Sequence, residues 1–503
     1  MNVEFYGAAS CVTGSCHILK VNGKTILLDC GMFQGKDEKE RGNISFVFNA
    51  KDIDFCLLTH AHIDHSGRIP LLYKQGFAGD VICTEATLDL CNVMLQDSGH
   101  IQEMEMEWKN RKRERQGLEK IEPIYSAEDA ASSMKLFRGY PYGKWIELFK
   151  GFKIRFNDAG HLLGSAIIEI VTEENGKETK LVYTGDLGNV NIPIINDPVN
   201  IDYADYLIME TTYGDRLHKT TENEFQELYK IIKDTFKRGG NVIIPSFAVG
   251  RTQEVIYALN KYVEKDALKD ISIYVDSPLA SESTAIFKRH EDVFDEEAKK
   301  LIASGDDPLA FKGLNFTKSS QESAALNKIN SGVVIISASG MCDAGRIKHH
   351  LKHNLWRKEC SIVFVGYQAE GTLGRRITDG EKTVKIFGEE IAVNAEIHQL
   401  QGLSGHADRL GLLRWLEAFK KIPKEILLVH GDLDASNSFK DLLTSKGYKS
   451  RVMDNGDTYD TSGSAHQVKI ESKKDRIYKL LDKLGNIDNI DNDEIVNKIK
   501  EIL

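Results

Sequence analysis

The stretch His60-Ala61-His62-Ile63-Asp64-His65 decides the class of fold and the chemistry expected of this chain. It places three histidines and one aspartate within six residues, directly after the apolar run 53–59, which predicts a strand. Neutral imidazoles and carboxylates are the usual ligands of zinc, and a strand end lets alternate side chains converge on one point. A polar loop that is rich in histidine by accident is the alternative, but the whole chain has only 15 histidines. The stretch therefore indicates a metal site.

Three isolated polar residues follow other expected strands in the first half of the chain. Asp29 precedes a Cys-Gly pair, and His161 and Asp186 each follow a glycine. Alone, each is typical of a turn. Because they occur in order around the histidine cluster, each at a strand end, they indicate further residues of the same site.

Three more residues occupy similar positions farther along the chain. Glu210 ends an apolar run, His406 follows a Ser-Gly pair, and His430 follows the apolar run 425–429. Without the other motifs, Glu210 would be interpreted as a strand-end carboxylate and His406 as a helix-capping histidine.

Together these motifs resemble the metallo-β-lactamase superfamily, and Glu210, His406 and His430 match motifs A, B and C of its β-CASP group. The members of this group process nucleic acids. The resemblance covers about residues 1–460. It implies an α/β protein, a four-layer αββα sandwich with an inserted α/β β-CASP cap domain.

The resemblance also implies roles for these residues. Two Zn²⁺ ions are expected as cofactors. Their implied ligands are His60, His62 and His161 for one ion, Asp64, His65 and His430 for the other, and Asp186 as the bridge. Asp29 would support the site. Asp64 would orient the attacking water, and His406, held by Glu210, would be the general acid.

The pattern of apolar runs predicts the domain organisation. Alternating runs near the N-terminus predict the first part of the metallo-β-lactamase domain at 1–210. From 211 to 394, helical segments alternate with the apolar runs 241–245, 271–275, 333–337 and 361–366, which indicates a parallel sheet and hence the cap. Residues 395–461 would complete the first domain. A polar linker and an amphipathic segment make 462–503 a helical C-terminal appendage.

Several residues of the cap are candidates for binding phosphate. Backbone amides at a helix start favour anions, and arginine adds paired donors. The candidates are Ser246, Arg251, Ser339, Gly340 and Arg375, the last followed by Arg376. Ordinary turn glycines and structural arginines are the alternative, above all for Arg375 and Arg376.

The composition indicates which cellular compartment to expect. The eight cysteines form no CxxC pair, and no apolar run approaches the ~20 residues that a membrane span needs. We therefore expect a cytoplasmic protein with free thiols and no membrane contact. The formal net charge of −10 argues mildly against nucleic acid, but a local basic groove and bound cations can outweigh it at short range, so the composition neither supports nor excludes RNA.

The expected function is a zinc-dependent ribonuclease that hydrolyses RNA phosphodiester bonds with two metal ions, internally, from the 5′ end, or both. Single-stranded RNA is the expected partner, and a homodimer is common in the family. His430 favours RNA, because histidine at motif C accompanies the RNA-processing members. The alternatives are a DNA nuclease, a thioester or lactone hydrolase of the same fold, and a non-catalytic RNA-binding scaffold. A full set of ligands argues against the scaffold.

Overall fold

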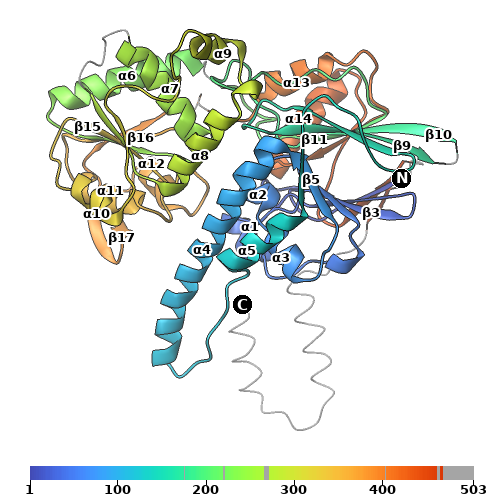
Figure 1. Cartoon of the computed structure of the whole chain (residues 1–503), viewed down its shortest axis with the longest axis horizontal. Helices are drawn as coiled ribbons and strands as arrows, with labels where there is room; N and C mark the ends of the chain where they lie inside the picture. Colours follow the sequence, from blue (N-terminus) through green and yellow to red (C-terminus); the bar gives the residue numbers. More distant parts are fainter. Residues whose placement is uncertain are drawn as a thin grey trace.

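The computed structural model describes residues 1–174, 176–218, 221–264, 271–400, 402, 404–461 and 465–467. Two bodies lie side by side in Figure 1, with the cap on the left and both chain halves of the first domain on the right. The expected appendage at 462–503 lies outside the described residues, apart from 465–467.

Two sheets form the centre of the first domain. The first has eight strands in the order β23 (Ala465–Gln467), β22 (Asp457–Asp460), β1 (Asn2–Phe5), β2 (His17–Val21), β3 (Lys24–Leu28), β4 (Phe55–Leu57), β5 (Asp80–Thr84), β6 (Phe137–Tyr140). The second has seven, in the order β21 (Ser450–Val452), β20 (Glu425–Val429), β11 (Tyr206–Glu210), β10 (Lys177–Tyr183), β9 (Ala166–Glu174), β8 (Phe152–Asp158), β7 (Ile146–Phe149). The C-terminal chain half thus supplies strands to both sheets.

The two sheets pack face to face through their apolar side chains. Alternate residues of each strand point to the same face, so Val3 and Phe5 of β1 meet Phe152 and Ile154 of β8 in one buried core. This core fixes the position of every strand end that carries a polar site residue.

Helices cover the outer face of each sheet. On the first sheet lie α2 (Ile63–Ser66), α3 (Ile69–Lys74), α4 (Glu85–Arg115) and α5 (Ala127–Ser133). On the second lie α13 (Arg409–Glu417) and α14 (Leu433–Ser445), whose Trp415 and Phe439 pack with Val182 and Leu207 of the sheet. The αββα sandwich predicted from the sequence is confirmed, together with its inserted α/β cap.

The cap is built on a parallel sheet of six strands. Their order is β14 (Leu314–Phe316), β13 (Ser272–Val275), β15 (Val333–Ser337), β12 (Val242–Pro245), β16 (Ser361–Phe364), β19 (Glu396–Gln399). Around it lie α6 (Thr221–Lys237), α7 (Arg251–Glu264), α8 (Pro278–Arg289), α9 (Glu296–Ala303), α10 (Ser320–Leu326), α11 (Ile347–Asn354) and α12 (Leu373–Thr378). A hairpin of β17 (Thr383–Ile386) and β18 (Glu389–Ala392) is attached.

The boundary expected between residues 394 and 395 differs from the strand pairing. β19 pairs in parallel with β16, Ser361 facing Glu396 and Phe364 facing Gln399. Residues 396–399 therefore belong to the cap sheet, and the chain returns to the first domain after Leu400. The short apolar segment 393–397 did not reveal which of two sheets it would join.

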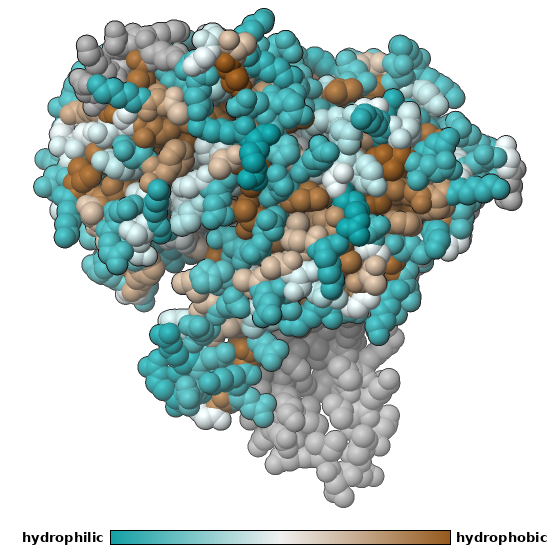
Figure 2. All heavy atoms as spheres, in the orientation of Figure 1, coloured by the Kyte–Doolittle hydropathy of each residue, from teal (hydrophilic) through white to brown (hydrophobic). Residues whose placement is uncertain are grey.

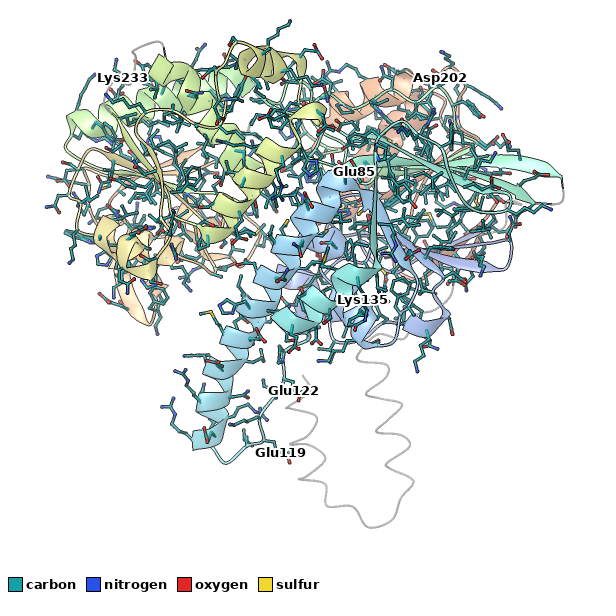
Figure 3. The ribbon with its side chains drawn as sticks, viewed as in Figure 1. Glu85, Glu119, Glu122, Lys135, Asp202 and Lys233 are labelled. Carbon is teal, nitrogen blue, oxygen red and sulfur yellow. The ribbon has the colours of Figure 1, made fainter. Side chains whose placement is uncertain are left out.

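Helix α4 is an arm that extends beyond the body. It begins at Thr84, whose hydroxyl caps the amide of Thr87. Figure 3 shows Glu85 near the centre of the molecule and Glu119 just past the far end of the helix. The outer half is mainly hydrophilic in Figure 2, as the charged segment 97–120 predicted. Within the described part of the chain, no helix has the length and apolar character of a bilayer span.

Candidate metal centre

The predicted ligands meet where several strands end. His60 and His62 follow β4 of the first sheet, whereas Asp186 and His430 follow β10 and β20 of the second. β10, β11 and β20 are parallel, so their carboxyl ends lie at one edge. The β8–β9 loop brings His161 to the same point. The site thus lies where the two sheets adjoin.

Unusual backbone conformations hold two of these residues. Asp29 and His430 have φ angles of 58° and 49°, a left-handed conformation that non-glycine residues rarely adopt. Beside Asp29, Gly31 lies so close to the His62–His65 turn that a Cβ atom would be 1.5 Å from the carbonyl oxygen of Asp64. The Cys-Gly pair after Asp29 therefore lets β3 approach the metal loop.

One group of donor atoms gathers around a carboxylate oxygen of Asp186. Nδ1 of His62 lies 3.0 Å from Nε2 of His60 and 3.2 Å from Nε2 of His161. Both Nε2 atoms lie 3.5 Å from Oδ2 of Asp186. These four residues can hold one metal ion.

A second group gathers around the other oxygen of Asp186. Oδ1 lies 3.2 Å from Nε2 of His65 and 3.5 Å from Nε2 of His430. Asp64 completes the group, with Oδ2 3.7 Å from Nε2 of His430. Since the two oxygens of Asp186 face different groups, this carboxylate has the placement of a bridging ligand.

Hydrogen bonds behind the histidines fix which ring nitrogen carries the proton. Thr59 donates its hydroxyl to Oδ2 of Asp29 at 2.9 Å, so its oxygen accepts from Nδ1 of His60 at 3.1 Å. Nδ1 of His65 donates to Oδ2 of Asp29 at 2.7 Å. Nε2 of both rings therefore points to the centre, where each can act as a ligand once it carries no proton.

Thr212 orients His430 in the same way. Its hydroxyl donates to the carbonyl oxygen of His430 at 3.0 Å, and its oxygen accepts from Nδ1 at 3.0 Å. Nε2 of His430 then points into the centre, 3.1 Å from Nε2 of His65. Two nitrogens this close need a proton or a metal cation between them.

The spacing of the donors fits a metal ion. Ligand atoms placed tetrahedrally at zinc–nitrogen distances are about 3.3 Å apart. The observed separations within the two groups run from 3.0 to 3.7 Å. The residues present therefore fit the metal that the histidine cluster predicted.

The electrostatic field favours a cation at the same point. Burial would lower the pKa of His65, but the carboxylates of Asp186 and Asp29 outweigh it and hold that pKa well above its usual value. Burial keeps the pKa of His60 and of His161 well below the usual value, so these rings are neutral. A divalent cation would balance the negative charge of these carboxylates, which otherwise favours a proton on His65.

A histidine–carboxylate pair borders the metal centre. Nδ1 of His406 lies 3.1 Å from Oε1 of the fully buried Glu210, and its Nε2 lies 3.9 Å from Oδ2 of Asp186. Burial opposes protonation, but Glu210 and Asp186 together raise the pKa of His406 to about 9. Glu210 is itself held by the amides of Leu187 and Thr212. His406 is therefore a protonated donor at neutral pH.

The expected phosphate-binding residues lie in the cap, beyond the cluster of metal-binding residues. Ser246 is buried and accepts from the Thr252 hydroxyl, and Arg251 is buried in an ion pair with Glu254. Ser339 donates to the carbonyl oxygen of Ala344 and follows a cis peptide bond. Gly340 lies beside the ring of Phe247, and Arg375 pairs with Asp379 at the surface. Among the described residues, no hydrogen bond joins the five candidates to the metal-binding residues.

Sequence reasoning missed the residues that orient the ligands. Thr59, Thr212 and Tyr183 were not singled out, although Thr59 directly precedes His60 and Thr212 follows Glu210 by two positions. Tyr183 donates to Oδ2 of Asp29 at 2.7 Å. Hydroxyl residues at strand ends next to metal ligands are the signal that would have found them.

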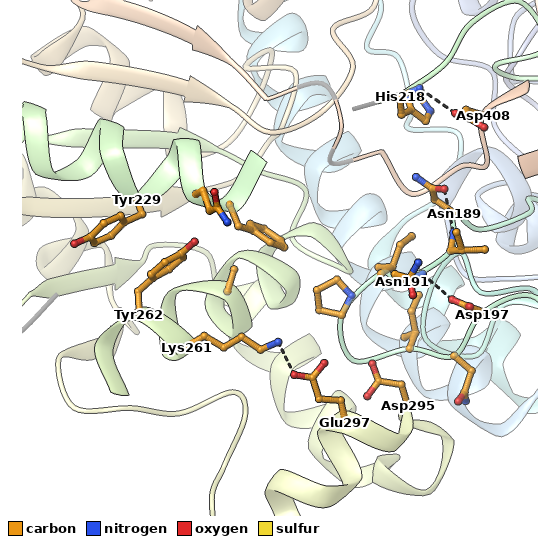
Figure 4. Close-up of a pocket in the computed structure, with 18 of the residues that line it drawn as sticks. Asn189, Asn191, Asp197, His218, Tyr229, Lys261, Tyr262, Asp295, Glu297 and Asp408 are labelled. Atoms are coloured by element: carbon orange, nitrogen blue, oxygen red, sulfur yellow. Dashed lines mark hydrogen bonds and ion pairs between the residues drawn. The ribbon is translucent and has the colours of Figure 1, made fainter. Parts of the chain in front are cut away.

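A cavity of about 1410 Å³ lies behind the His406 loop, between the first domain and helices α6 and α7. Figure 4 shows Asn189, Asn191 and Asp197 on one side and the stacked rings of Tyr229 and Tyr262 on the other. Its walls include the acidic residues Asp197, Asp295, Glu297 and Asp408. This lining does not favour a polyanion.

Three family models match successive parts of the chain. They are the metallo-beta-lactamase superfamily over residues 9–230, the Beta-Casp domain over 252–377 and the Zn-dependent metallo-hydrolase RNA specificity domain over 390–453. The fold and the site thus define a metal-dependent hydrolase of the metallo-β-lactamase fold.

Curated relatives narrow the class. Ribonuclease TTHA0252 of Thermus thermophilus is 38% identical over 447 residues, 89% of this chain and 97% of that protein. The chain belongs to the β-CASP family of metallo-β-lactamase enzymes.

Two archaeal proteins from Methanocaldococcus jannaschii are also similar. An RNase J-like protein is 31% identical over 87% of this chain and 94% of its own length. Transcription termination factor FttA is 30% identical over 89% of this chain and 70% of its own length. A solved structure of a protein of unknown function from Enterococcus faecalis V583 shares the fold, with a TM-score of 0.52 and 12% identity over 93% of this chain and 99% of that chain.

Proposed function

We propose that the protein is a ribonuclease that hydrolyses phosphodiester bonds of RNA at this centre. The observation that carries the proposal is the pair of donor groups that share Asp186, bordered by a protonated His406 held on Glu210. Two further findings support RNA as the substrate. A relative that matches almost over its whole length bears the name ribonuclease, and the matched RNA specificity domain spans residues 390–453, which include His406 and His430.

The metal that we propose is zinc, with one ion for each donor group. Imidazole nitrogens dominate both groups, and nitrogen ligands suit zinc better than magnesium or calcium. Two separate donor groups lie on the two oxygens of Asp186, His60 and His161 at Oδ2 and His65 and His430 at Oδ1. This arrangement supports two ions rather than one.

The chemistry divides between the metals and the protein. Two bound zinc ions would activate water near neutral pH and offset the charge of the phosphodiester. The protein's own residues manage the protons. Burial opposes ionisation of Asp64, but a hydrogen bond from His430 and the charge of His65 lower the pKa of Asp64 to about 2, so it stays ionised and can orient the attacking water.

His406 supplies the proton that the leaving 3′ oxygen needs. The Glu210 carboxylate accepts from Nδ1–H, so Nε2–H is the proton that can be donated. Glu210 therefore acts as a positioning residue that keeps the imidazole charged and fixes the direction of its Nε2–H bond.

The cap would hold the RNA strand. Ser246, Arg251, Ser339, Gly340 and Arg375 stay candidates for this role, because they follow the carboxyl ends of cap strands or lie on α12 beside that edge. The charge of Arg251 is balanced by Glu254, so Arg251 would position the RNA rather than attract it by charge. A raised KM for RNA with unchanged kcat in Arg251→Ala would support its contact with substrate; an unchanged KM would remove it.

The remaining parts of the proposal concern organisation. We propose a first domain of residues 1–210 and 401–461, interrupted by a cap of residues 211–400, since β19 completes the cap sheet. A homodimer and a cytoplasmic location are also proposed. The eight cysteines are free and buried, as suits a reducing compartment.

DNA is the strongest competing substrate, and a thioester or lactone is the next. A long cap and the Glu210–His406 pair favour a polymeric phosphodiester over a small ester. The test measures cleavage of matched RNA and DNA strands and of a thioester, with purified protein, with chelator and with zinc restored. Cleavage of RNA alone supports the proposal, whereas equal cleavage of DNA or turnover of the thioester alone contradicts it. RNA with a 5′-monophosphate or 5′-triphosphate then distinguishes internal cuts from trimming.

A further inference from the structure

An exposed phenylalanine lies at the edge of the cap sheet. Phe247 comes two residues after β12 and is 40% exposed, although most large apolar side chains near it are buried. Two adjacent carbons of its ring, Cδ2 and Cε2, lie close to Gly340 and Gly366, which follow β15 and β16. A Cβ atom at residue 340 would lie 3.1 Å from both ring carbons. Glycine at this position therefore allows the ring to approach the backbone closely.

The loops beneath the ring are fixed by hydrogen bonds. The side-chain amide of the buried Gln368 donates to the carbonyl oxygens of Gly340 at 3.0 Å and Gly366 at 3.2 Å. The hydroxyl of Thr252 donates to the carbonyl oxygen of Phe247 at 2.7 Å. These bonds fix the loops around the ring, while Phe247 keeps 40% of its surface exposed.

A second exposed aromatic side chain belongs to the loop that Phe247 contacts. Tyr367 directly follows Gly366 and is 46% exposed. Burial raises the pKa of its phenol group, the charge of Asp432 adds to this and that of Arg375 opposes it. Asp432 follows His430 by two residues, so the phenol group lies within electrostatic range of the loop that carries this predicted metal ligand.

The Phe247 loop also touches the loop of another predicted ligand. A Cβ atom on Gly250 would lie 2.9 Å from Cδ1 of Leu162, the residue after His161. The platform formed by Phe247 and Tyr367 therefore belongs to the part of the cap that contacts the His161 loop.

From this placement we infer that Phe247, with Tyr367 beside it, stacks an unpaired nucleobase of the RNA next to the phosphodiester that is cleaved. The inference rests on the proposed function and adds a recognition element to it. Every base has a flat face, so such a contact binds RNA of any sequence but needs an unstacked base. Removing one such contact weakens binding by about 5- to 150-fold.

Kinetics with a matched control variant test the inference. Phe247→Leu keeps an apolar side chain but removes the flat ring, and Phe387→Leu makes the same change at an exposed phenylalanine of the β17–β18 hairpin. The substrates are an RNA strand and the same strand with one base removed, at each position around the cleaved bond in turn. We expect Phe247→Leu to lower kcat/KM on intact RNA by about 5- to 150-fold, and by less than about twofold where the removed base is the stacked one.

An equal loss on intact RNA and on every abasic strand would overturn the inference and assign Phe247 a structural role. Phe387→Leu should match the wild type on all strands; if it loses as much as Phe247→Leu, the effect is not specific to the platform. Absence of RNA cleavage by the wild type with zinc would instead contradict the proposed function.

A binding measurement makes the test independent of turnover. His406→Ala protein with metal bound is mixed with RNA that carries the fluorescent adenine analogue aminopurine at the same position. Stacking quenches this fluorophore, so we expect quenching with Phe247 present and its loss in the Phe247→Leu, His406→Ala double variant. Equal quenching in both proteins would overturn the inference even if RNA binds.

Discussion

Asp186 is the residue on which the two donor groups depend. Its Oδ2 faces His60 and His161, while its Oδ1 faces His65 and His430. Burial would favour the neutral acid, but the surrounding histidines hold the pKa of Asp186 well below its usual value. No other described residue is shared between both groups in this way, so substitution here would disturb both sites together.

Removal of the proposed general acid should separate metal binding from turnover. In His406→Ala we expect both donor groups to keep their metal, because neither includes this histidine, while kcat for RNA falls by about 10²–10⁴-fold. Metal content by elemental analysis and single-turnover cleavage are the measurements. His100→Ala, on the exposed side of α4, is the control and should behave as the wild type. Normal turnover of RNA by a fully metallated His406→Ala variant would contradict the role of His406 as general acid.

The pH profile should report the partnership of His406 with Glu210. A general acid works only when protonated, so the rate is maintained below the pKa of His406, about 9, and is lost as pH rises through it. Glu210→Gln removes a carboxylate that raises this pKa, so the alkaline limb should move to lower pH. An alkaline limb at unchanged pH in Glu210→Gln, with metal content intact, would contradict the pairing.

Residue-level prediction from the sequence was most specific where one residue type has few other uses. The clustered histidines were recognisable from the sequence alone, and the seven predicted ligands lie together in two groups that could hold a metal. The supporting hydroxyls of Thr59 and Thr212 were not predicted, because both are ordinary strand-end residues and only the fold places them beside a ring nitrogen. Likewise His350 lies in a histidine-rich segment, and only the fold shows that it is buried and binds Asp276 at 2.6 Å.

At the scale of elements, the cap sheet is tied to its helices by one buried carboxylate. Asp276 follows β13 and accepts from Ser323 of α10, from His350 of α11 and from Arg346 just before α11. Burial opposes its charge, but the bonds from His350, Ser323, Thr317 and Arg346 hold the pKa of Asp276 well below its ordinary value. This carboxylate therefore joins three elements.

Asp276→Asn should destabilise the cap by about 3–5 kcal/mol, because it leaves the buried partners of the carboxylate without a charge. A depressed carboxyl pKa contributes stability above the unfolded value near 4, so the difference from the wild type should shrink as pH falls below about 4. Urea unfolding at several pH values measures it. Glu389→Gln, which breaks an exposed pair with Lys352, is the control and should cost less than about 1 kcal/mol. Equal losses of stability in Asp276→Asn and Glu389→Gln would contradict the structural role of Asp276.

The break between α2 and α3 and the sheet that β19 joins could not be predicted from local sequence. Helices α2 and α3 are separated by only two residues, and at this break the side chain of Arg68 donates to the carbonyl oxygen of Gly31 at 2.5 Å. Similarly, β19 joins the cap because its partner β16 is exposed at that edge. Both outcomes depend on partners distant in the sequence, and no local pattern encodes them.

For the whole molecule, metal and stability should be linked. Each ion bound only by the folded chain adds about 2.7 kcal/mol when its free concentration is one hundred times Kd. Chelator should therefore lower Tm and abolish RNA cleavage, and zinc should restore both, while calcium should restore neither because the donors are mainly nitrogen. Elemental analysis and thermal unfolding check this. Full activity in chelator-treated protein that contains no divalent ion would contradict a metal-dependent site.

The order in which the chain supplies its residues has a consequence for synthesis. Residues 1–210 contain His60, His161, Asp186 and Glu210, but His406 and His430 follow the entire cap. A nascent chain on the ribosome can fold its early parts while the last strands are still being made. Such a chain lacks two of its essential imidazoles, so we expect it to remain inert toward the messenger that encodes it until nearly all of its length has emerged.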